Sequence, residues 1–566
     1  MLRRRLLLAL SLLSLAGSPF AQTHDIVDDD DGPVVDGLPA QQLTPQILYQ
    51  LLLAEIAGQR RQFGLSVPAY LDLARSTRDP RIARRSAEIA LHARQFDAAL
   101  EATRLWTELQ PQDALAKQTL ANVLVATQRL DELAVVLQRD LAVAGPSVGP
   151  ILLRLNRVLA SQSDKAAVMR LVEKLTLPYL ELAEAHFVRA QSAVNARDAM
   201  RGIAEIDQAL AIQPDWEMAA VFKAQNLPEG QARQDFLAGF VKAYPAAREM
   251  RLVYARSLIS EKRFEDARRE FRTLLESFPD NAEIAFAVGM LSMELNDGAD
   301  AEIRLRQVVA LGQAKVDGAR FYLARIAEVG SRTEDALRWY GDVAHGEYFV
   351  QARVRGAQIL NHFDRVLEAR TWLQQGRERS PPDAPALAVA EAQLLRERGQ
   401  LTDAFDFLQR QLVQYVDNDE LLYEAGLAAE RLQRLGDAEK YFRRLIETKP
   451  KSPQGYNALG YSLADRSERL EEAEALIDKA LALAPDDFYI LDSKGWVLYR
   501  RGKAEQALDY LRRAYTARAE PEIAAHFGEV LWKLGRHEEA SKLWREANQA
   551  APDNAELMAT MKRFLP

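Results

Sequence analysis

The sequence predicts an all-α solenoid built from helix–turn–helix repeats, and three observations lead to that prediction. An alanine recurs through the C-terminal half of the 566-residue chain at intervals of 33 to 35 residues, and residues of fixed type stand at fixed distances from it. Almost no segment shows the sustained alternation that a half-buried strand requires. A period of this length indicates one supersecondary unit copied many times. The recurring alanines are Ala267, Ala301, Ala336, Ala369, Ala404, Ala438, Ala473, Ala507 and Ala540.

The companions of this alanine define the two helices of each repeat. Small glycine and alanine residues allow two helices to approach closely, and proline ends the second helix because it lacks an N–H donor. Glycines stand twelve or thirteen residues before the alanine at Gly289, Gly426, Gly460, Gly495 and Gly528. Large apolar residues stand four residues after it at Phe271, Leu305, Tyr340, Leu373, Leu408, Phe442, Ile477, Leu511 and Trp544. Prolines stand twelve residues after it at Pro279, Pro450, Pro485 and Pro552.

The clearest repeat lies between Pro521 and Pro552. Its first helix is predicted from an apolar stripe with helical spacing, formed by Ile523, Phe527, Val530 and Leu531. Gly535 introduces a tight turn. The second helix carries the apolar residues Ala540, Leu543, Trp544 and Ala547.

This spacing of small, bulky and proline positions resembles the tetratricopeptide repeat. The resemblance implies a right-handed superhelix of helix–turn–helix units. It is strong from about residue 245 onward and weaker upstream, where length changes interrupt the repeats. The upstream traces of the motif are Ala99 with Trp106 and Pro111, and Ala209 with Pro214.

The ends of the array have their own signals. We expect a degenerate helical array over 43–245, a regular one over 246–553, and a capping helix over 554–566 with an apolar face. Before the first recognisable repeat, Thr44 to Ile56 has the pattern of an amphipathic helix. Its apolar residues Ile47, Leu48, Leu51 and Leu52 are candidates for contact with a partner, because the helix lies outside the regular stack.

The first residues read as an export signal. Three arginines precede an apolar run from Leu6 to Ala16, which is too short to span a bilayer, so 1–21 is predicted to be a signal peptide. Residues 22–42 are rich in aspartate, glycine and proline and are expected to form an acidic, flexible tether. A calcium loop is the alternative for this segment, but its spacing would place Val27 and Leu38 at ligand positions.

Ser18 stands where a bacterial lipobox would carry its lipidated cysteine, in Leu15-Ala16-Gly17-Ser18. The chain has no cysteine, so thioether lipidation, disulfides and zinc–thiolate sites are excluded for this sequence. Three interpretations stay open: a relative cleaved near Ala21, an engineered form of a lipoprotein, and an accidental match. We expect an exported, periplasmic protein, with association to the outer membrane left open.

Little in the sequence points to chemistry. The net charge of −8 argues against nucleic-acid binding, and we expect no metal or cofactor. Gly145 to Gly149 matches the G-x-S-x-G nucleophile pattern, but helical sequence precedes it, so we interpret it as an inter-repeat loop. A hydrolase using Ser147 is the enzymatic alternative. His526 and His537 share a repeat but fall on different helices, which disfavours a metal site.

The resemblance also implies which side chains face a partner, because the first helix of each repeat lines the concave surface in this family. Tyr, Trp and Arg dominate protein-binding hot spots. The alternative is that Trp496 and Trp532 only pack against adjacent helices. Asp492 occupies a position where the family's carboxylate-gripping clamp has lysine. The implied contact residues are Tyr423, Asn457, Tyr461, Trp496, Tyr499, Arg500, Trp532 and Lys533.

An exported protein made almost entirely of such repeats resembles the proteobacterial outer-membrane repeat lipoproteins that partner a periplasmic carboxyl-terminal processing protease. The stretches Ala54–Arg60 and Ser76–Pro80 add to this resemblance. It implies a non-enzymatic adaptor that holds the protease and presents cell-wall hydrolases to it. The alternative is a scaffold for polysaccharide synthesis or export, or for other envelope assembly.

Overall fold

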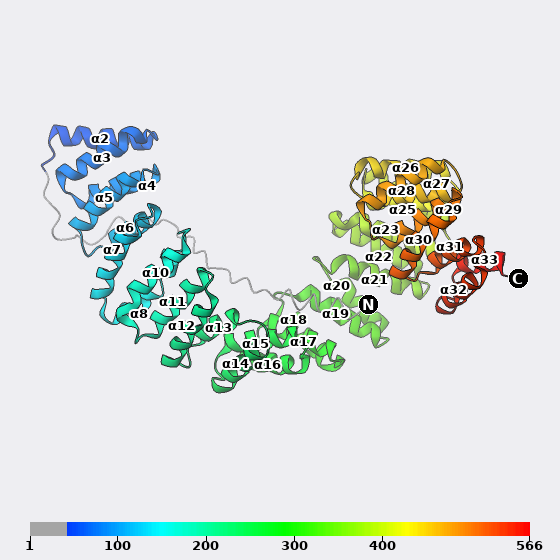
Figure 1. Cartoon of the computed structure of the whole chain (residues 1–566), viewed down its shortest axis with the longest axis horizontal. Helices are drawn as coiled ribbons and strands as arrows, with labels where there is room; N and C mark the ends of the chain where they lie inside the picture. The colour runs from blue at the N-terminus through cyan, green and yellow to red at the C-terminus, as the bar shows by residue number, and fades with distance from the viewer. Residues whose placement is uncertain (1–41, 566) are drawn as a thin grey trace. The chain divides into compact units, whose positions relative to one another are not determined.

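The computed structural model describes residues 42–565, and within this range every regular element is a helix, which confirms the all-α prediction (Figure 1). The predicted signal peptide, and the predicted tether up to residue 41, lie outside the described residues. The chain divides into two compact units, with the boundary between Asp297 and Gly298.

Most helices of both units are 10 to 15 residues long, and the exceptions are two helices of the first unit, with five and four residues. The first unit contains α2 (Pro45–Gln59), α3 (Phe63–Thr77), α4 (Pro80–His92), α5 (Phe96–Leu109), α6 (Ala114–Ala126), α7 (Leu130–Val143), α8 (Val148–Leu152), α9 (Leu155–Val158), α10 (Lys165–Thr176), α11 (Ala183–Asn195), α12 (Ala199–Ile212), α13 (Glu217–Asn226), α14 (Gln231–Ala243), α15 (Arg248–Ser260), α16 (Phe264–Ser277) and α17 (Ala282–Glu294), with the 3₁₀ turns η1 (Gly145–Ser147) and η2 (Leu177–Tyr179).

The second unit contains α18 (Gly298–Leu311), α19 (Val316–Val329), α20 (Thr333–Asp342), α21 (Phe349–His362), α22 (Val366–Arg379), α23 (Ala384–Glu397), α24 (Leu401–Gln414), α25 (Asp419–Arg431), α26 (Leu435–Thr448), α27 (Pro453–Asp465), α28 (Leu470–Leu483), α29 (Phe488–Arg500), α30 (Ala504–Ala517), α31 (Pro521–Lys533), α32 (His537–Ala550) and α33 (Ala555–Phe564), with the 3₁₀ turn η3 (Pro381–Asp383).

Hairpins stack in order along the second unit. From α21 onward, each first helix packs against its own second helix and against the first helices of neighbouring hairpins, as α29 does with α30, α27 and α31. The first helices therefore form one layer of the stack. The last helix, α33, packs on α31 and α32 and buries Leu557 and Thr560, so it covers the end of the array.

The motif alanines occupy the position that their spacing predicts. All nine lie in second helices, and each is at most 1% exposed. The glycines of the first helices meet the bulky residue that follows each alanine by one turn. A Cβ atom on Gly495 would lie 2.5 Å from Cγ of Leu511, and one on Gly528 would overlap the indole of Trp544. Each bulky side chain therefore fills the space left by a missing side chain on its hairpin partner.

Ion pairs join successive second helices in a recurring pattern. Glu302, directly after a motif alanine in α18, accepts hydrogen bonds from both terminal nitrogens of Arg332, at 3.0 and 2.7 Å. Glu439, also directly after a motif alanine, pairs in the same way with Arg469. These arginine hydrogen bonds lower the pKa of each glutamate to about 2, and the second pairing arginines, Arg306 and Arg443, add to the effect.

The first unit departs from the regular pattern in its middle. Residues 145–158 form η1 and the short helices α8 and α9 where a full repeat would have two long helices. A Cβ atom on Gly149 would lie 2.5 Å from Oε1 of Glu184 on α11, so a larger residue there would displace the end of that side chain. Further along, Trp216 packs against Phe187, with ring centroids 4.9 Å apart. Buried alanines, including Ala190 and Ala209, still pack in the core around these rings.

Candidate protein-binding groove

A groove of about 650 Å³ runs across the C-terminal hairpins of the second unit. It is lined by first helices, by the residue that caps α29, and by α33. No lining residue comes from the second helices α26, α28, α30 or α32. The groove therefore lies on the layer that the repeat resemblance assigns to partner binding. The lining residues are Tyr423, Leu427, Glu430, Arg431, Pro453, Gln454, Asn457, Ala458, Tyr461, Asp487, Tyr489, Ile490, Asp492, Ser493, Glu522, Ile523, His526 and Glu556.

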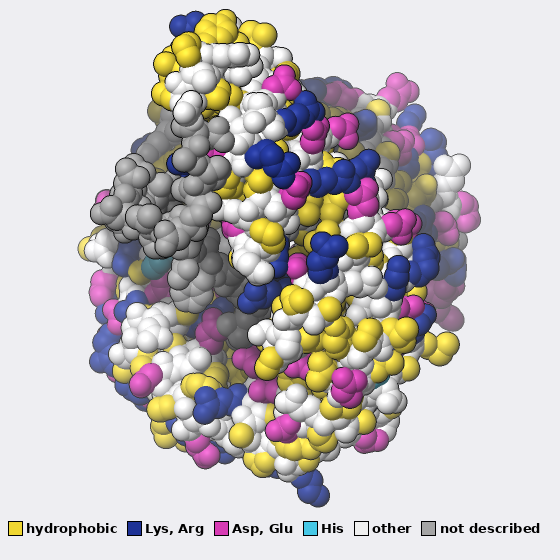
Figure 2. Space-filling view, turned by 90° about the vertical axis from the view of Figure 1, so that its left-hand side faces the viewer, with side chains coloured by type: hydrophobic (Ala, Val, Ile, Leu, Met, Phe, Trp, Pro, Cys, Tyr) yellow, Lys and Arg dark blue, Asp and Glu magenta, His cyan; other side chains and the backbone are white. Residues whose placement is uncertain are grey.

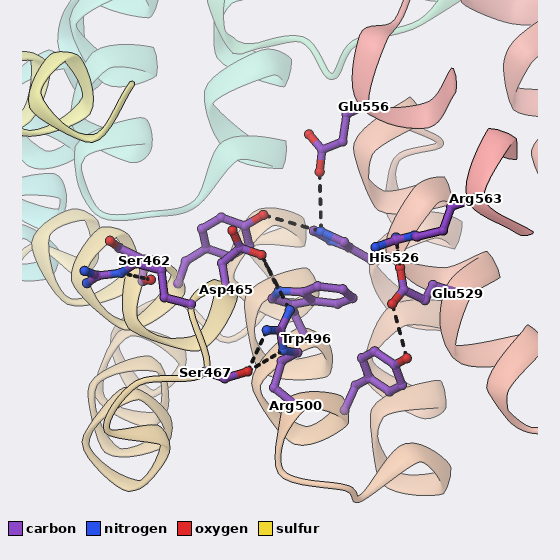
Figure 3. Close-up of polar contacts among 12 residues, drawn as sticks. Ser462, Asp465, Ser467, Trp496, Arg500, His526, Glu529, Glu556 and Arg563 are labelled. Carbon is purple, nitrogen blue, oxygen red and sulfur yellow. Dashed lines mark hydrogen bonds and ion pairs between the residues drawn. The ribbon is translucent and has the colours of Figure 1, made fainter. Parts of the chain in front are cut away.

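His526 is the buried polar centre of the groove. Its Nδ1 lies 3.0 Å from both carboxylate oxygens of Asp492, and its Nε2 lies 3.4 Å from Oη of Tyr461 and 3.5 Å from Oε1 of Glu556. Figure 3 shows Glu556 reaching towards the imidazole from α33, with the indole of Trp496 beside the ring. Four helices therefore meet at this one side chain.

The pKa of His526 is raised above its ordinary value of 6.5. Burial by itself would lower this pKa, but the charge and hydrogen bond of Asp492 raise it, and the charges of Glu556 and Asp465 add to the effect. The groove therefore favours a positive charge at its centre.

Burial dominates the pKa shifts of the other titratable groups in the groove, and neighbouring carboxylates add to it. Burial raises the pKa of the Glu430 carboxyl. Burial also raises the pKa of Glu556, and so do the nearby charges of Glu522, Asp492 and Asp465, while His526 lowers it. The pKa of Tyr461 is raised first by burial and then by the surrounding carboxylates. A cation entering the groove would offset the part of these shifts that comes from the neighbouring carboxylates.

Three of the contact residues implied by the sequence, Tyr423, Asn457 and Tyr461, line the groove directly. Trp496 lies beneath it and is only 4% exposed, donating its indole N–H to Asp465 at 3.2 Å. Arg500 sits over the Trp496 ring and donates to Oγ of Ser467 (Figure 3).

The remaining implied residues lie further along the stack, towards α33. Tyr499 donates its hydroxyl to Glu529 at 3.2 Å. Trp532 stacks on His537 and packs against Trp544 and Phe564. Lys533 is exposed. None of these three lines the groove.

Several groove residues escaped the sequence prediction, including Tyr489, Glu522, His526 and Glu556. Only His526 among these could have been found from the sequence, by its position relative to a packing glycine. Ala458, Ser493 and His526 each stand two residues before a packing glycine, and all three line the groove. Glu556 carries no such signal, because it belongs to the capping helix α33 rather than to a repeat.

The other implied contact surface is the N-terminal helix α2, which carries an exposed apolar face. Leu48 is 41% exposed and Leu52 is 51% exposed, and Figure 2 shows hydrophobic side chains gathered over this helix at the top of the view. Ile47 is partly buried, and Leu51 packs against the core of the first unit. Three further apolar residues of this helix are also exposed: Tyr49, Leu53 and Ile56.

The sequence motifs that could indicate catalysis or metal binding do not lie in the structural context that such sites require. Ser147 is exposed in η1, and the helix α7 precedes it where a nucleophile elbow requires a strand. Within residues 42–565, no three His, Asp or Glu side chains gather in a way that could hold a metal ion. In the same range, no helix combines the length and apolar character needed to cross a bilayer.

A second cavity, of about 430 Å³, lies in the first unit among α15, α16 and α17. Its lining includes arginine and glutamate side chains together with Phe271 and Phe278. It is smaller than the groove and holds none of the residues that the repeat resemblance implies for partner contact.

Comparison with known proteins agrees with this architecture. The sequence profile described as tetratricopeptide repeat matches residues 230–282, 255–315, 423–488 and 493–555. The TPR repeat-containing protein PA4667 of Pseudomonas aeruginosa is 34% identical over 491 residues, which cover 85% of this chain and 82% of that protein. The chain therefore belongs to the tetratricopeptide repeat family, whose members generally act as non-catalytic scaffolds that bind other proteins.

More distant similarities are local or structural. A TPR repeat-containing protein of Methanocaldococcus jannaschii is 29% identical over 114 residues, 20% of each chain. Among solved structures, the anaphase-promoting complex hetero-tetramer Cut9–Hcn1 aligns over 92% of this chain and 97% of that chain, with 13% identity and a TM-score of 0.33. A repeat protein of Parabacteroides merdae aligns over 50% and 99%, with 16% identity and a TM-score of 0.34.

Proposed function

We propose that this protein is a non-enzymatic adaptor of the bacterial envelope, which holds a periplasmic carboxyl-terminal processing protease and presents cell-wall hydrolases to it. The observation that carries the proposal is the exposed apolar face of α2. Leu48 and Leu52 lie on this face, one helical turn apart, with large exposed fractions. Contiguous apolar surface of this kind marks protein-interaction sites.

The attachment of α2 supports a role in binding rather than in capping alone. Ala54 and Ala57 face α3, Oγ of Ser66 donates to the Ala54 carbonyl oxygen at 2.7 Å, and Glu55 pairs with Arg85 at 2.9 Å. One side of the helix is thus fixed to the first unit, while its other side presents leucines to solvent. A rigid helix with apolar residues one turn apart suits a helix-in-groove contact with a partner.

The groove in the second unit gives the protein a second binding surface. The two surfaces belong to different units and share no residue, so we assign the protease to α2 and its substrate to the groove. An adaptor between a protease and its substrates needs separate binding surfaces for the two. Export to the periplasm is part of the same proposal.

The proposal is tested with the purified protein and the purified carboxyl-terminal processing protease of the source bacterium. The double variant Leu48→Ser/Leu52→Ser should weaken their binding by about tenfold or more, because exposed apolar anchors dominate such contacts. The double variant Leu115→Ser/Val135→Ser removes two exposed apolar residues elsewhere in the first unit and should bind normally. Addition of the wild-type protein should accelerate hydrolase cleavage by the protease. Equal binding by both double variants, or cleavage unchanged by the protein, would contradict the proposal.

A further inference from the structure

The groove has an excess of negative charge that its own cations do not balance. Its lining includes five carboxylates, Glu430, Asp487, Asp492, Glu522 and Glu556, against the cationic side chains Arg431 and His526. Two of the five serve mainly to hold the fold together, and two others also have partners there: Glu556 lies 3.5 Å from Nε2 of His526, and Glu430 receives a hydrogen bond from Ser462. Asp487 caps α29 by accepting from the amides of Tyr489 and Ile490, and Asp492 holds His526.

The three remaining carboxylates face the groove from different helices. Glu430 lies on α25, Glu522 on the first turn of α31, and Glu556 on α33, where 48% of its side chain is exposed. Their spread over three helices suits several cationic groups along one chain better than a single metal ion. This agrees with the finding that residues 42–565 hold no cluster with metal-binding geometry.

A hydrogen-bond acceptor in the groove also lacks a donor. Oδ1 of Asn457 is buried, and it has no hydrogen-bond partner within residues 42–565. An unpaired buried acceptor is costly, and a ligand N–H would satisfy it once the asparagine side chain turns its oxygen towards the groove. A lysine, an arginine or a peptide amide can supply this donor.

The walls between these polar groups are aromatic and aliphatic. Tyr423, Tyr461 and Tyr489 line the groove together with Leu427, Ile490 and Ile523. Tyrosine rings stack on guanidinium groups and pack against the methylene stems of lysine. The groove thus combines carboxylates for cationic heads with apolar surface for their stems.

From these observations we infer that the groove binds a peptide segment of a partner protein that carries lysine or arginine side chains. The inference deepens the proposed function, because it states which chemistry marks a substrate for delivery. The excess of carboxylates reinforces it, since uncompensated negative charge in the groove repels the terminal carboxylate of a peptide. Acidic segments are disfavoured for the same reason.

The test uses the full chain and fluorescein-labelled peptides that differ only in their charged positions. One peptide carries lysines between tyrosines and leucines, and its two counterparts carry glutamine or glutamate at the lysine positions. By fluorescence anisotropy, the lysine peptide should bind about tenfold more tightly than the glutamine peptide, and the glutamate peptide more weakly still. Added salt should weaken the binding of the lysine peptide and leave that of the glutamine peptide nearly unchanged, because salt screens the attraction between charges.

Matched variants locate the effect. The double variant Glu522→Gln/Glu556→Gln should reduce lysine-peptide affinity by about fivefold to tenfold and leave the glutamine peptide unchanged. The double variant Glu505→Gln/Glu538→Gln removes two exposed carboxylates from the second helices α30 and α32, and should bind as the wild type does. Melting curves followed by circular dichroism check that both variants fold.

Each contrary result has a distinct meaning. Equal affinity for the lysine and glutamine peptides, or equal losses in the two double variants, would overturn the inference. Displacement of the lysine peptide by an equal concentration of spermidine would also overturn it, because the groove would then select small polyamines. Protease capture through α2 is measured separately. Lysine-peptide selectivity without protease capture would overturn the proposed function alone.

Discussion

The imidazole of His526 lies flat against the indole of Trp496, with ring centroids 4.2 Å apart and planes 23° apart. The two rings come from the first helices of neighbouring hairpins, α31 and α29. Asp492, one turn before Trp496 on α29, holds the same imidazole. This stack and this ion pair together fasten two hairpins beneath the groove, so Trp496 shapes the floor of the groove from below.

We expect His526 to titrate above the ordinary histidine pKa, since Asp492 outweighs the effect of burial. A pKa raised by folding contributes stability that is complete below about 6.5 and is lost as the pH rises through the folded value. Asp492→Asn should lower the His526 pKa in an NMR titration and flatten the fall of the melting temperature above pH 6.5. Glu556, Asp465 and Tyr461 also face the ring, and they stay in place in this variant. An unchanged pKa in Asp492→Asn would contradict the assignment.

The fit between Gly528 and Trp544 should be visible as coupled destabilisation. Gly528→Ala pushes a methyl group into the indole and should cost about 1–3 kcal/mol. Trp544→Ala should cost about 3–5 kcal/mol by leaving a cavity. The double variant should cost less than the two single changes together, because the cavity accepts the methyl group.

The control for this pair is Gly436→Ala in α26, where an added Cβ meets no atom within 4 Å. That change should stabilise the protein by about 0.5–1 kcal/mol, since alanine is the better helix former. Urea unfolding measures all four variants. Strict additivity of the Gly528 and Trp544 changes would show that the two residues do not compete for one space.

Glu302→Gln should remove an acid-sensitive part of the stability. The Arg332 pairing lowers the pKa of Glu302 from 4.5 to about 2, so its contribution is present above pH 4.5 and is lost as the pH falls towards 2. Because 22% of the side chain is exposed, we expect a loss of about 1–2 kcal/mol at neutral pH. The difference from wild type should vanish near pH 2 in denaturant titrations. Glu447→Gln, which breaks an exposed pair with Arg444, should change stability by less than about 0.5 kcal/mol and serves as the control.

The two sides of α2 should respond differently to the same substitution. Leu51 packs against the core of the first unit, so Leu51→Ser should destabilise that unit by about 1–2 kcal/mol. Leu52 is mostly in solvent, and Leu52→Ser should change stability by less than about 0.5 kcal/mol. Thermal melts of the two variants measure the difference. Equal destabilisation would mean that the Leu52 face is covered, which would remove the basis for a contact surface on α2.

Much of the fold could be predicted because the residues that pack together within a repeat are close in the sequence. Ala507, Leu511 and Gly495 belong to one hairpin, so their spacing along the chain is enough to show that they meet. The irregular stretch 145–158 could not be assigned, since its short helices lack the motif residues and rest on contacts with α11. The site was predictable only in part: Tyr423, Asn457 and Tyr461 follow from their place before or after a packing glycine, whereas Glu556 does not.

The sequence by itself determined the helical hairpin, its period, and the small and bulky residues that close it, because these depend on side chains close together in the chain. Only the tertiary structure decided which side chains from successive hairpins share one groove, and that Trp496 lies under it. The stacking of first helices sets that arrangement, and it brings Tyr461, His526 and Glu556 together from three helices. Local spacing cannot encode a meeting of residues that depends on how one hairpin leans on the next.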